Sequence, residues 1–214
     1  DAVIRMGTGT VLALAMSASV SGRLRAPLPG YDMVEGEMWR HSVTAALAAE
    51  TLAGWSRLAV PGGAPAAALL HDIGKLVLAQ TVSPNVLQLI QRTAAREGRT
   101  LTDVETTVLG INHGQVGGLV GLHWKLPDAI VEAIINHHTA RSHTGPIAHV
   151  VYLAQAAAED LNPPPATDDP NAMSPPRDPV DPVPMIALGI EPERYHDLLV
   201  TTQQRYALLS VRFS

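Results

Sequence analysis

The chain has 214 residues, of which 46% are hydrophobic and 16% charged, so it can bury the core of one substantial domain. A net charge of −5, with no basic run, excludes a nucleic-acid backbone as an electrostatic partner. The absence of cysteine excludes disulfides and thiolate metal sites, which leaves His, Asp and Glu as metal ligands.

Helical spacing of apolar residues predicts a first helix over residues 2–20. Its apolar centre, Val11–Met16, is too short to cross a membrane, and no signal-peptide cleavage pattern follows it. We therefore expect a buried helix and a soluble, cytoplasmic protein. The chain begins at Asp1 instead of a methionine, which is typical of a fragment or a processed protein.

A long helix is predicted over residues 32–55, after a proline-containing loop. Glu37 and His41 lie four residues apart on it and therefore share one face. A shorter helix over residues 64–70 ends at the string His71-Asp72-Ile73-Gly74-Lys75. An adjacent imidazole and carboxylate suit a divalent metal ion, and the nearby ammonium suits a phosphate oxygen.

Further helices are predicted from Pro84 to Gly98, from Thr102 to about Gly110, and from Asn112 to Trp124. An amphipathic helix over residues 128–138 ends in His137 and His138. Pro146 opens another helix that runs to about residue 160. Strand signals are weak throughout, so the predicted fold is an all-α multi-helix bundle.

The helical bundle is predicted to cover residues 1–161, and two further segments follow it. Residues 162–184 contain nine of the seventeen prolines and are predicted to form an extended, flexible excursion. Residues 185–214 then return as a C-terminal helix that packs on the bundle.

Metal-capable side chains recur at helix ends and on shared helix faces. A single histidine there is usually a cap or a packed core residue, and for His113 alone that explanation suffices. The whole set is harder to explain in this way, because four separate helices contribute to it. We therefore predict a metal pocket built from Glu37, His41, His71, Asp72, His113, His137 and His138.

Taken in order, these motifs resemble the HDOD domain of bacterial signalling proteins, within the HD superfamily. The resemblance spans about residues 2–160. The strings that carry it are Trp39-Arg40-His41-Ser42, His71-Asp72-Ile73-Gly74-Lys75, Glu105 with Leu109-Gly110-Ile111-Asn112-His113-Gly114-Gln115-Val116-Gly117, Trp124-Lys125-Leu126-Pro127, and Ala133-Ile134-Ile135-Asn136-His137-His138. It implies an all-α cytoplasmic regulatory module, fused to or working beside other signalling domains, with additional helices upstream. HDOD proteins generally have no established catalytic activity.

The seven candidate ligands also match the ligand order of the related HD-GYP phosphodiesterases, which hydrolyse cyclic dinucleotides with two or three metals. This resemblance implies that Asp72 bridges two metal ions and that Lys75 contacts the phosphate. Two departures weigh against catalysis. Gln155 replaces the last aspartate ligand of the superfamily, and residues 139–146 lack the Gly-Tyr-Pro signature of the substrate loop.

Three hypotheses follow. The first is a regulatory HDOD module that retains an iron or manganese pocket, without turnover, and contacts other signalling proteins or fused domains. The second is a metal-dependent phosphohydrolase of a cyclic dinucleotide or another nucleotide, with Asp72 as a catalytic residue and Lys75 as a substrate-binding one. The third is a helical scaffold with an empty pocket. None of them involves DNA or a membrane.

Overall fold

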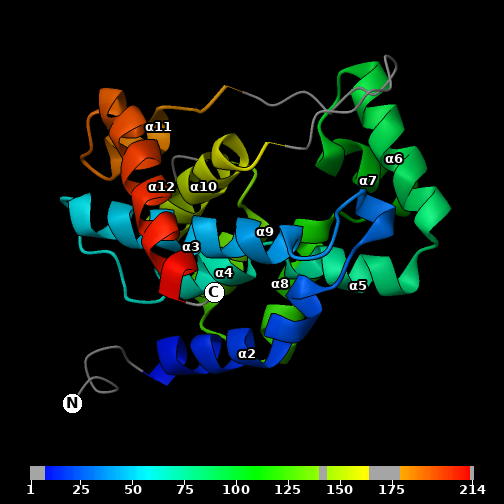
Figure 1. Cartoon of the computed structure of the whole chain (residues 1–214), viewed down its shortest axis with the longest axis horizontal. Coiled ribbons are helices and arrows are strands. Elements are labelled where there is room, and N and C mark those ends of the chain that lie inside the picture. Colours follow the sequence, from blue (N-terminus) through cyan, green and yellow to red (C-terminus); the bar gives the residue numbers. More distant parts are fainter. Residues whose placement is uncertain (1–7, 140–143, 164–178, 213–214) are drawn as a thin grey trace.

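The computed structural model describes residues 8–139, 144–163 and 179–212 (Figure 1). Within these ranges the chain is helical, and the only strand-like pairing is an isolated bridge between Leu28 and Met33. The predicted all-α class is therefore confirmed. No helix in the described ranges combines the length and the apolarity needed to cross a membrane.

The helices follow one another along the chain with short connections. The first seven elements are α2 (Thr8–Arg25), the 3-10 helix η1 (Pro29–Tyr31), α3 (Glu37–Trp55), α4 (Ala64–Leu70), α5 (Ile73–Thr81), α6 (Pro84–Glu97) and α7 (Leu101–Leu109). The remaining ones are α8 (His113–His123), α9 (Asp128–Ile135), α10 (Pro146–Leu161), α11 (Val183–Ala187), η2 (Pro192–Arg194) and α12 (Tyr195–Arg212).

Two apolar clusters form the core. The first cluster is built mainly by α3, α4, α9 and α10, and the second by η1, α5, α6 and the ends of α2 and α8. The two groups of helices lie side by side in Figure 1, and Val20 and Trp124 contact both clusters. The chain crosses from the first cluster, at Leu70, to the second, at Ile73. His71 and Asp72 therefore lie on the boundary between the clusters.

Several helix boundaries differ from the prediction. α3 begins at Glu37, five residues late, because Asp32 and Gly36 have left-handed φ angles of 52° and 80° that a helix cannot contain. α2 continues to Arg25, into the predicted loop. α9 ends at Ile135, three residues early, so His137 and His138 lie in the turn that follows.

The start of α8 is held by a capping box. The Asn112 side chain accepts a hydrogen bond from the Gln115 N–H, and the Gln115 side chain accepts one from the Asn112 N–H. This confirms the predicted helix start. Gly74 of α5 packs against the first turn of α8, where an added Cβ would overlap the His113 carbonyl and lie 2.7 Å from Gly117 N. The close contact brings the end of α4 alongside His113.

The C-terminal helix lies against α3. Arg205 of α12 donates to Thr51 Oγ1 over 2.9 Å and forms an ion pair with Glu50. Most of the predicted proline-rich excursion, residues 164–178, lies outside the described residues. α11 begins at Val183, inside the range predicted to be non-helical, because Pro182 and Pro184 can occupy the first turn of a helix.

The contact between α5 and α8 can be tested by replacing Gly74 with alanine. Because backbone atoms would have to move apart, we expect a loss of about 3 kcal/mol in the free energy of unfolding, measured by urea denaturation. The control is Gly54→Ala in α3, where an added Cβ meets nothing within 4 Å. That change should be neutral or stabilise by up to about 1 kcal/mol. Equal effects of the two changes would contradict the close contact.

Candidate metal centre

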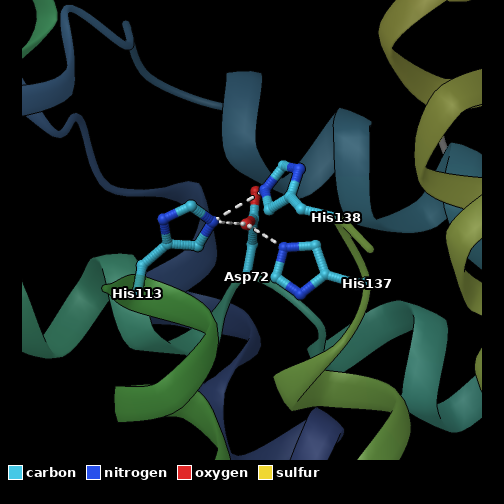
Figure 2. Close-up of side chains that lie close together, drawn as sticks. All are labelled: Asp72, His113, His137 and His138. Atoms are coloured by element: carbon cyan, nitrogen blue, oxygen red, sulfur yellow. Dashed lines mark hydrogen bonds and ion pairs between the residues drawn. The ribbon is translucent and has the colours of Figure 1, made fainter. Parts of the chain in front are cut away.

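Six of the seven predicted ligands converge on the boundary between the two apolar clusters. His41 comes from α3, and His71 and Asp72 lie between α4 and α5. His113 begins α8, and His137 and His138 follow α9. They form two groups that share Asp72, and within each group the ligand atoms lie within 4.8 Å of one another. We name these the four-ligand group (Asp72, His113, His137 and His138; Figure 2) and the three-ligand group (His41, His71 and Asp72).

The two oxygens of Asp72 face different groups. Oδ1 lies 3.4 Å from His113 Nε2 and 3.5 Å from His137 Nε2, in the four-ligand group (Figure 2). Oδ2 lies 2.7 Å from Lys75 Nζ and 3.5 Å from His71 Nε2, on the side of the three-ligand group. The Asp72 side chain is only 1% exposed, so these neighbours determine its chemistry.

His113 is oriented by a buried carboxylate. Glu105 Oε2 accepts hydrogen bonds from the backbone N–H of His113, at 2.9 Å, and from its ring Nδ1, at 2.6 Å. Tyr31 donates to the other oxygen, Oε1, over 2.9 Å. Because an ionised carboxylate only accepts, Nδ1 carries the ring proton and Nε2 presents its lone pair to the four-ligand group. Such a carboxylate–histidine pair is the usual support of a metal ligand.

Backbone carbonyls orient two more of the rings. His71 Nδ1 donates to the Ala68 carbonyl over 2.6 Å, and His137 Nδ1 donates to the Ile134 carbonyl over 2.7 Å. In their neutral forms, both rings therefore present the Nε2 lone pair to the centre of the pocket. In the described part of the chain, His137 Nε2 and Asp72 Oδ1 are buried and have no hydrogen-bond partner.

The four-ligand group fits a first-row metal ion. Buried acceptors that converge without a donor need an explanation, and a cation supplies one. Asp72 Oδ1 lies 3.4 Å from His113 Nε2 and 3.5 Å from His137 Nε2, and His113 Nε2 lies 2.9 Å from His138 Nε2. Ligands at about 2.1 Å from a tetrahedral ion lie about 3.4 Å apart. Imidazole nitrogen with carboxylate oxygen suits iron, manganese or zinc.

The protonation states also suit a cation. Burial lowers the pKa of His137 to about 4 and that of His41 to about 3, and it holds the pKa of His138 well below its usual value. Burial alone would raise the pKa of Asp72, but Lys75 and the surrounding histidines hold it well below its usual range. At neutral pH these imidazoles are neutral and the carboxylate is charged, as metal ligands must be.

The structure does not bring Glu37 into either group. Its Oε2 accepts a hydrogen bond from the Val34 N–H over 2.7 Å, at the beginning of α3. Lys75 lies inside the site, where its ammonium group is paired with Asp72 and its side chain is 12% exposed. Gln155, which replaces the expected last carboxylate, lies beside His41 with 2.7 Å between its Oε1 and His41 Nε2.

The sequence placed Glu105 among the residues that carry the family resemblance but gave no chemical role to it or to Tyr31. A signal for Glu105 did exist, because this glutamate follows the apolar Val104 in a short helix and a buried carboxylate needs a dedicated partner. Tyr31 gave none, since it lies in a Pro-Gly-Tyr turn and meets Glu105 only through the tertiary fold.

Comparison with known proteins identifies a family. The family model described as the HDOD domain matches residues 1–140, which is more than half of the chain. No curated protein is significantly similar to the chain in sequence.

Several solved structures share the fold. A candidate phosphohydrolase from Shewanella amazonensis SB2B is 22% identical with a TM-score of 0.66, and the match covers 96% of this chain and 73% of that one. An HDOD domain protein of unknown function from Geobacter sulfurreducens is 18% identical with a TM-score of 0.62, over 96% and 71%. The MmoQ response regulator from Methylococcus capsulatus is 21% identical with a TM-score of 0.53, over 75% and 60%.

The buried histidines predict an acid-sensitive fold when no metal is bound. The folded pKa values of His41 and His137, about 3 and about 4, lie below the unfolded value of 6.5. Their contribution to stability is therefore complete above pH 6.5 and is lost as the pH falls through this window. At about pH 5 we expect a loss of roughly 2 kcal/mol per histidine, measured by urea denaturation in EDTA. His137→Asn should flatten the pH dependence, whereas an unchanged profile would contradict the assignment.

The support of His113 by Glu105 predicts a specific defect. Glu105→Gln keeps the size of the side chain but removes the charge, so we expect metal affinity to fall by about 10–100-fold in a chelator competition titration. Tyr31→Phe should have a smaller effect in the same direction, because it removes one hydrogen bond to Glu105 and leaves the carboxylate. Unchanged affinity in Glu105→Gln would contradict the supporting role of the Glu105 charge.

Proposed function

Because the chain belongs to the HDOD domain family, we propose that it is a signal-transduction module whose helical bundle binds a divalent metal ion and does not turn over a substrate. The ion would be held by Asp72, His113, His137 and His138, with iron or manganese as the expected metal. The observation that carries this proposal is the convergence of buried acceptors at Asp72 Oδ1 and His137 Nε2 that have no donor in the described residues.

A metal ion in this position would connect the two apolar clusters. Asp72 precedes α5 and His113 begins α8, on the side of the second cluster, whereas His137 and His138 follow α9 of the first cluster. Binding would therefore fix how the two groups of helices are arranged. That arrangement can be read by a partner signalling protein or by a fused domain, as the likeness to a response regulator suggests.

The surroundings of the pocket favour binding over hydrolysis. When bound, a divalent ion polarises a phosphoryl oxygen and neutralises developing charge. In this chain the lysine that would contact a phosphate is paired with Asp72, and the amide of Gln155 replaces a carboxylate next to His41. Both features reduce the negative charge that is available to hold more than one cation.

A second candidate function is a metal-dependent phosphohydrolase that acts on a cyclic dinucleotide or another nucleotide. The observation in its favour is that the two oxygens of Asp72 face two separate groups of histidines, as a bridging ligand would. One of the similar structures is also described as a candidate phosphohydrolase, although its 22% identity carries only the fold.

Metal analysis is the decisive experiment. Protein purified without chelator or nickel resin should contain iron or manganese, and saturating metal should stabilise the metal-free form by about 3 kcal/mol, or roughly 5–10 °C in Tm. Asp72→Asn, which keeps the shape of the side chain and removes its charge, should lose both the metal and the stabilisation. Wild-type protein that binds neither metal, with an unchanged Tm, would refute the metal pocket.

A hydrolysis assay separates the two candidate functions. Metal-loaded protein is incubated with cyclic di-GMP and with a generic phosphodiester under reducing conditions, and no product is expected. Metal-dependent hydrolysis that Asp72→Asn abolishes would replace the regulatory function with the enzymatic one.

A further inference from the structure

We propose that the pocket binds a single metal ion, in the four-ligand group, and that Gln155 and Lys75 together prevent the three-ligand group from binding a second. This inference rests on the proposed metal-binding function and concerns how many ions the site holds. It follows from where the protons and hydrogen bonds of each group lie.

The first step concerns the tautomer of His41. Gln155 Nε2 donates to Glu159 Oε1 over 2.8 Å, which turns the amide so that its oxygen faces His41 Nε2 at 2.7 Å. Since an amide oxygen only accepts, His41 Nε2 must carry a proton. The nitrogen that faces the three-ligand group therefore has no lone pair to offer to a cation.

The same proton also faces His71. Its Nε2 lies 3.1 Å from His41 Nε2 and is an acceptor, because His71 Nδ1 donates its proton to the Ala68 carbonyl. One N–H of His41 thus lies between two acceptors, the Gln155 oxygen and the His71 nitrogen. The two histidines of this group are already paired with each other.

Lys75 is paired with the third candidate ligand atom of this group. Its Nζ lies 2.7 Å from Asp72 Oδ2, the oxygen of Asp72 on the side of the three-ligand group. A second divalent cation in this group would have to displace the ammonium group or bind beside it. The ammonium group and the cation would repel each other strongly, because they would lie close together in a site from which water is largely excluded.

The four-ligand group differs at Asp72, which no ammonium group of the described residues occupies on this side, and at His113 and His137, whose Nε2 atoms carry no proton. Asp72 Oδ1 and His137 Nε2 have no hydrogen-bond partner in the described residues, and Glu105 keeps the proton of His113 on Nδ1. The remaining member, His138, contacts His113 through Nε2 at 2.9 Å. His138 is more exposed than the other three, so its proton can move to Nδ1 or to water when a cation binds.

A single ion has a chemical consequence. A cation held by Asp72 and the three histidines of the four-ligand group would, when bound, attract a phosphate or carboxylate group of a small ligand. Hydrolysis of a phosphodiester by the two-metal route needs a second cation to stabilise the leaving oxygen. The geometry therefore does not supply the two-metal route, and it suits a site that senses metal, alone or with an anionic ligand.

The test exchanges the amide and the carboxylate of the Gln155–Glu159 pair, so that residue 159 donates the hydrogen bond and residue 155 accepts it. The double variant Gln155→Glu/Glu159→Gln keeps the net charge and allows the same side-chain hydrogen bond, but it places a carboxylate oxygen against His41 Nε2. Each protein is loaded with Mn²⁺ and desalted, and its bound manganese is measured by elemental analysis and by electron paramagnetic resonance.

Wild type and the control Glu159→Gln should bind one Mn²⁺ with the spectrum of an isolated ion. The double variant should gain a second, spin-coupled ion, and adding Lys75→Gln should strengthen its binding. Two Mn²⁺ ions in wild type, or no second ion even in the triple variant, would overturn the inference while leaving the metal pocket intact. Wild type that binds no Mn²⁺ would refute the pocket itself.

Single-site variants provide an independent check that does not depend on the redesigned pair. His71→Ala should retain the bound ion, whereas His137→Ala should lose it, and circular dichroism reports whether each variant is folded. Loss of the ion from a folded His71→Ala protein would overturn the assignment to the four-ligand group.

Discussion

A carboxylate that is only 1% exposed costs free energy unless charges and hydrogen bonds around it compensate for the lost water. Asp72 is such a carboxylate, and Lys75 compensates at one of its oxygens. The other oxygen faces imidazole nitrogens that have lone pairs instead of protons. The ion pair therefore keeps Asp72 charged, and the charge that remains available points into the four-ligand group.

The fold places this charge where distant parts of the chain meet. Gly74 allows α5 to approach the first turn of α8, which sets Asp72 beside His113. α9 ends early enough for His137 and His138 to leave the helix and enter the same space. Because these elements belong to different apolar clusters, the ligand set can form only when both clusters are packed. Formation of the site and packing of the two clusters therefore depend on each other.

The sequence was sufficient to predict the helical class, and six of the seven candidate ligands that it suggested lie together in the fold, because helix periodicity and helix ends are local features. Glu37 was predicted from an i, i+4 spacing with His41 that holds, yet its carboxylate caps the backbone at Val34. That outcome depends on the left-handed backbone of Asp32 and Gly36. The bond between Tyr31 and Glu105 joins residues 74 positions apart, which no local pattern reports.

The two histidine groups show that similar residue types can present different atoms to the same carboxylate. Both contain Nε2 atoms that face Asp72, and their residue types are nearly the same. They differ in their second neighbours, since a carboxylate moves the proton of His113 away from the pocket and an amide oxygen moves that of His41 into it. A neutral imidazole carries one proton, so each ring can coordinate on one side only. Gln155 thus offers no negative charge to a cation in the three-ligand group, and its oxygen accepts from the nitrogen of His41 that faces this group.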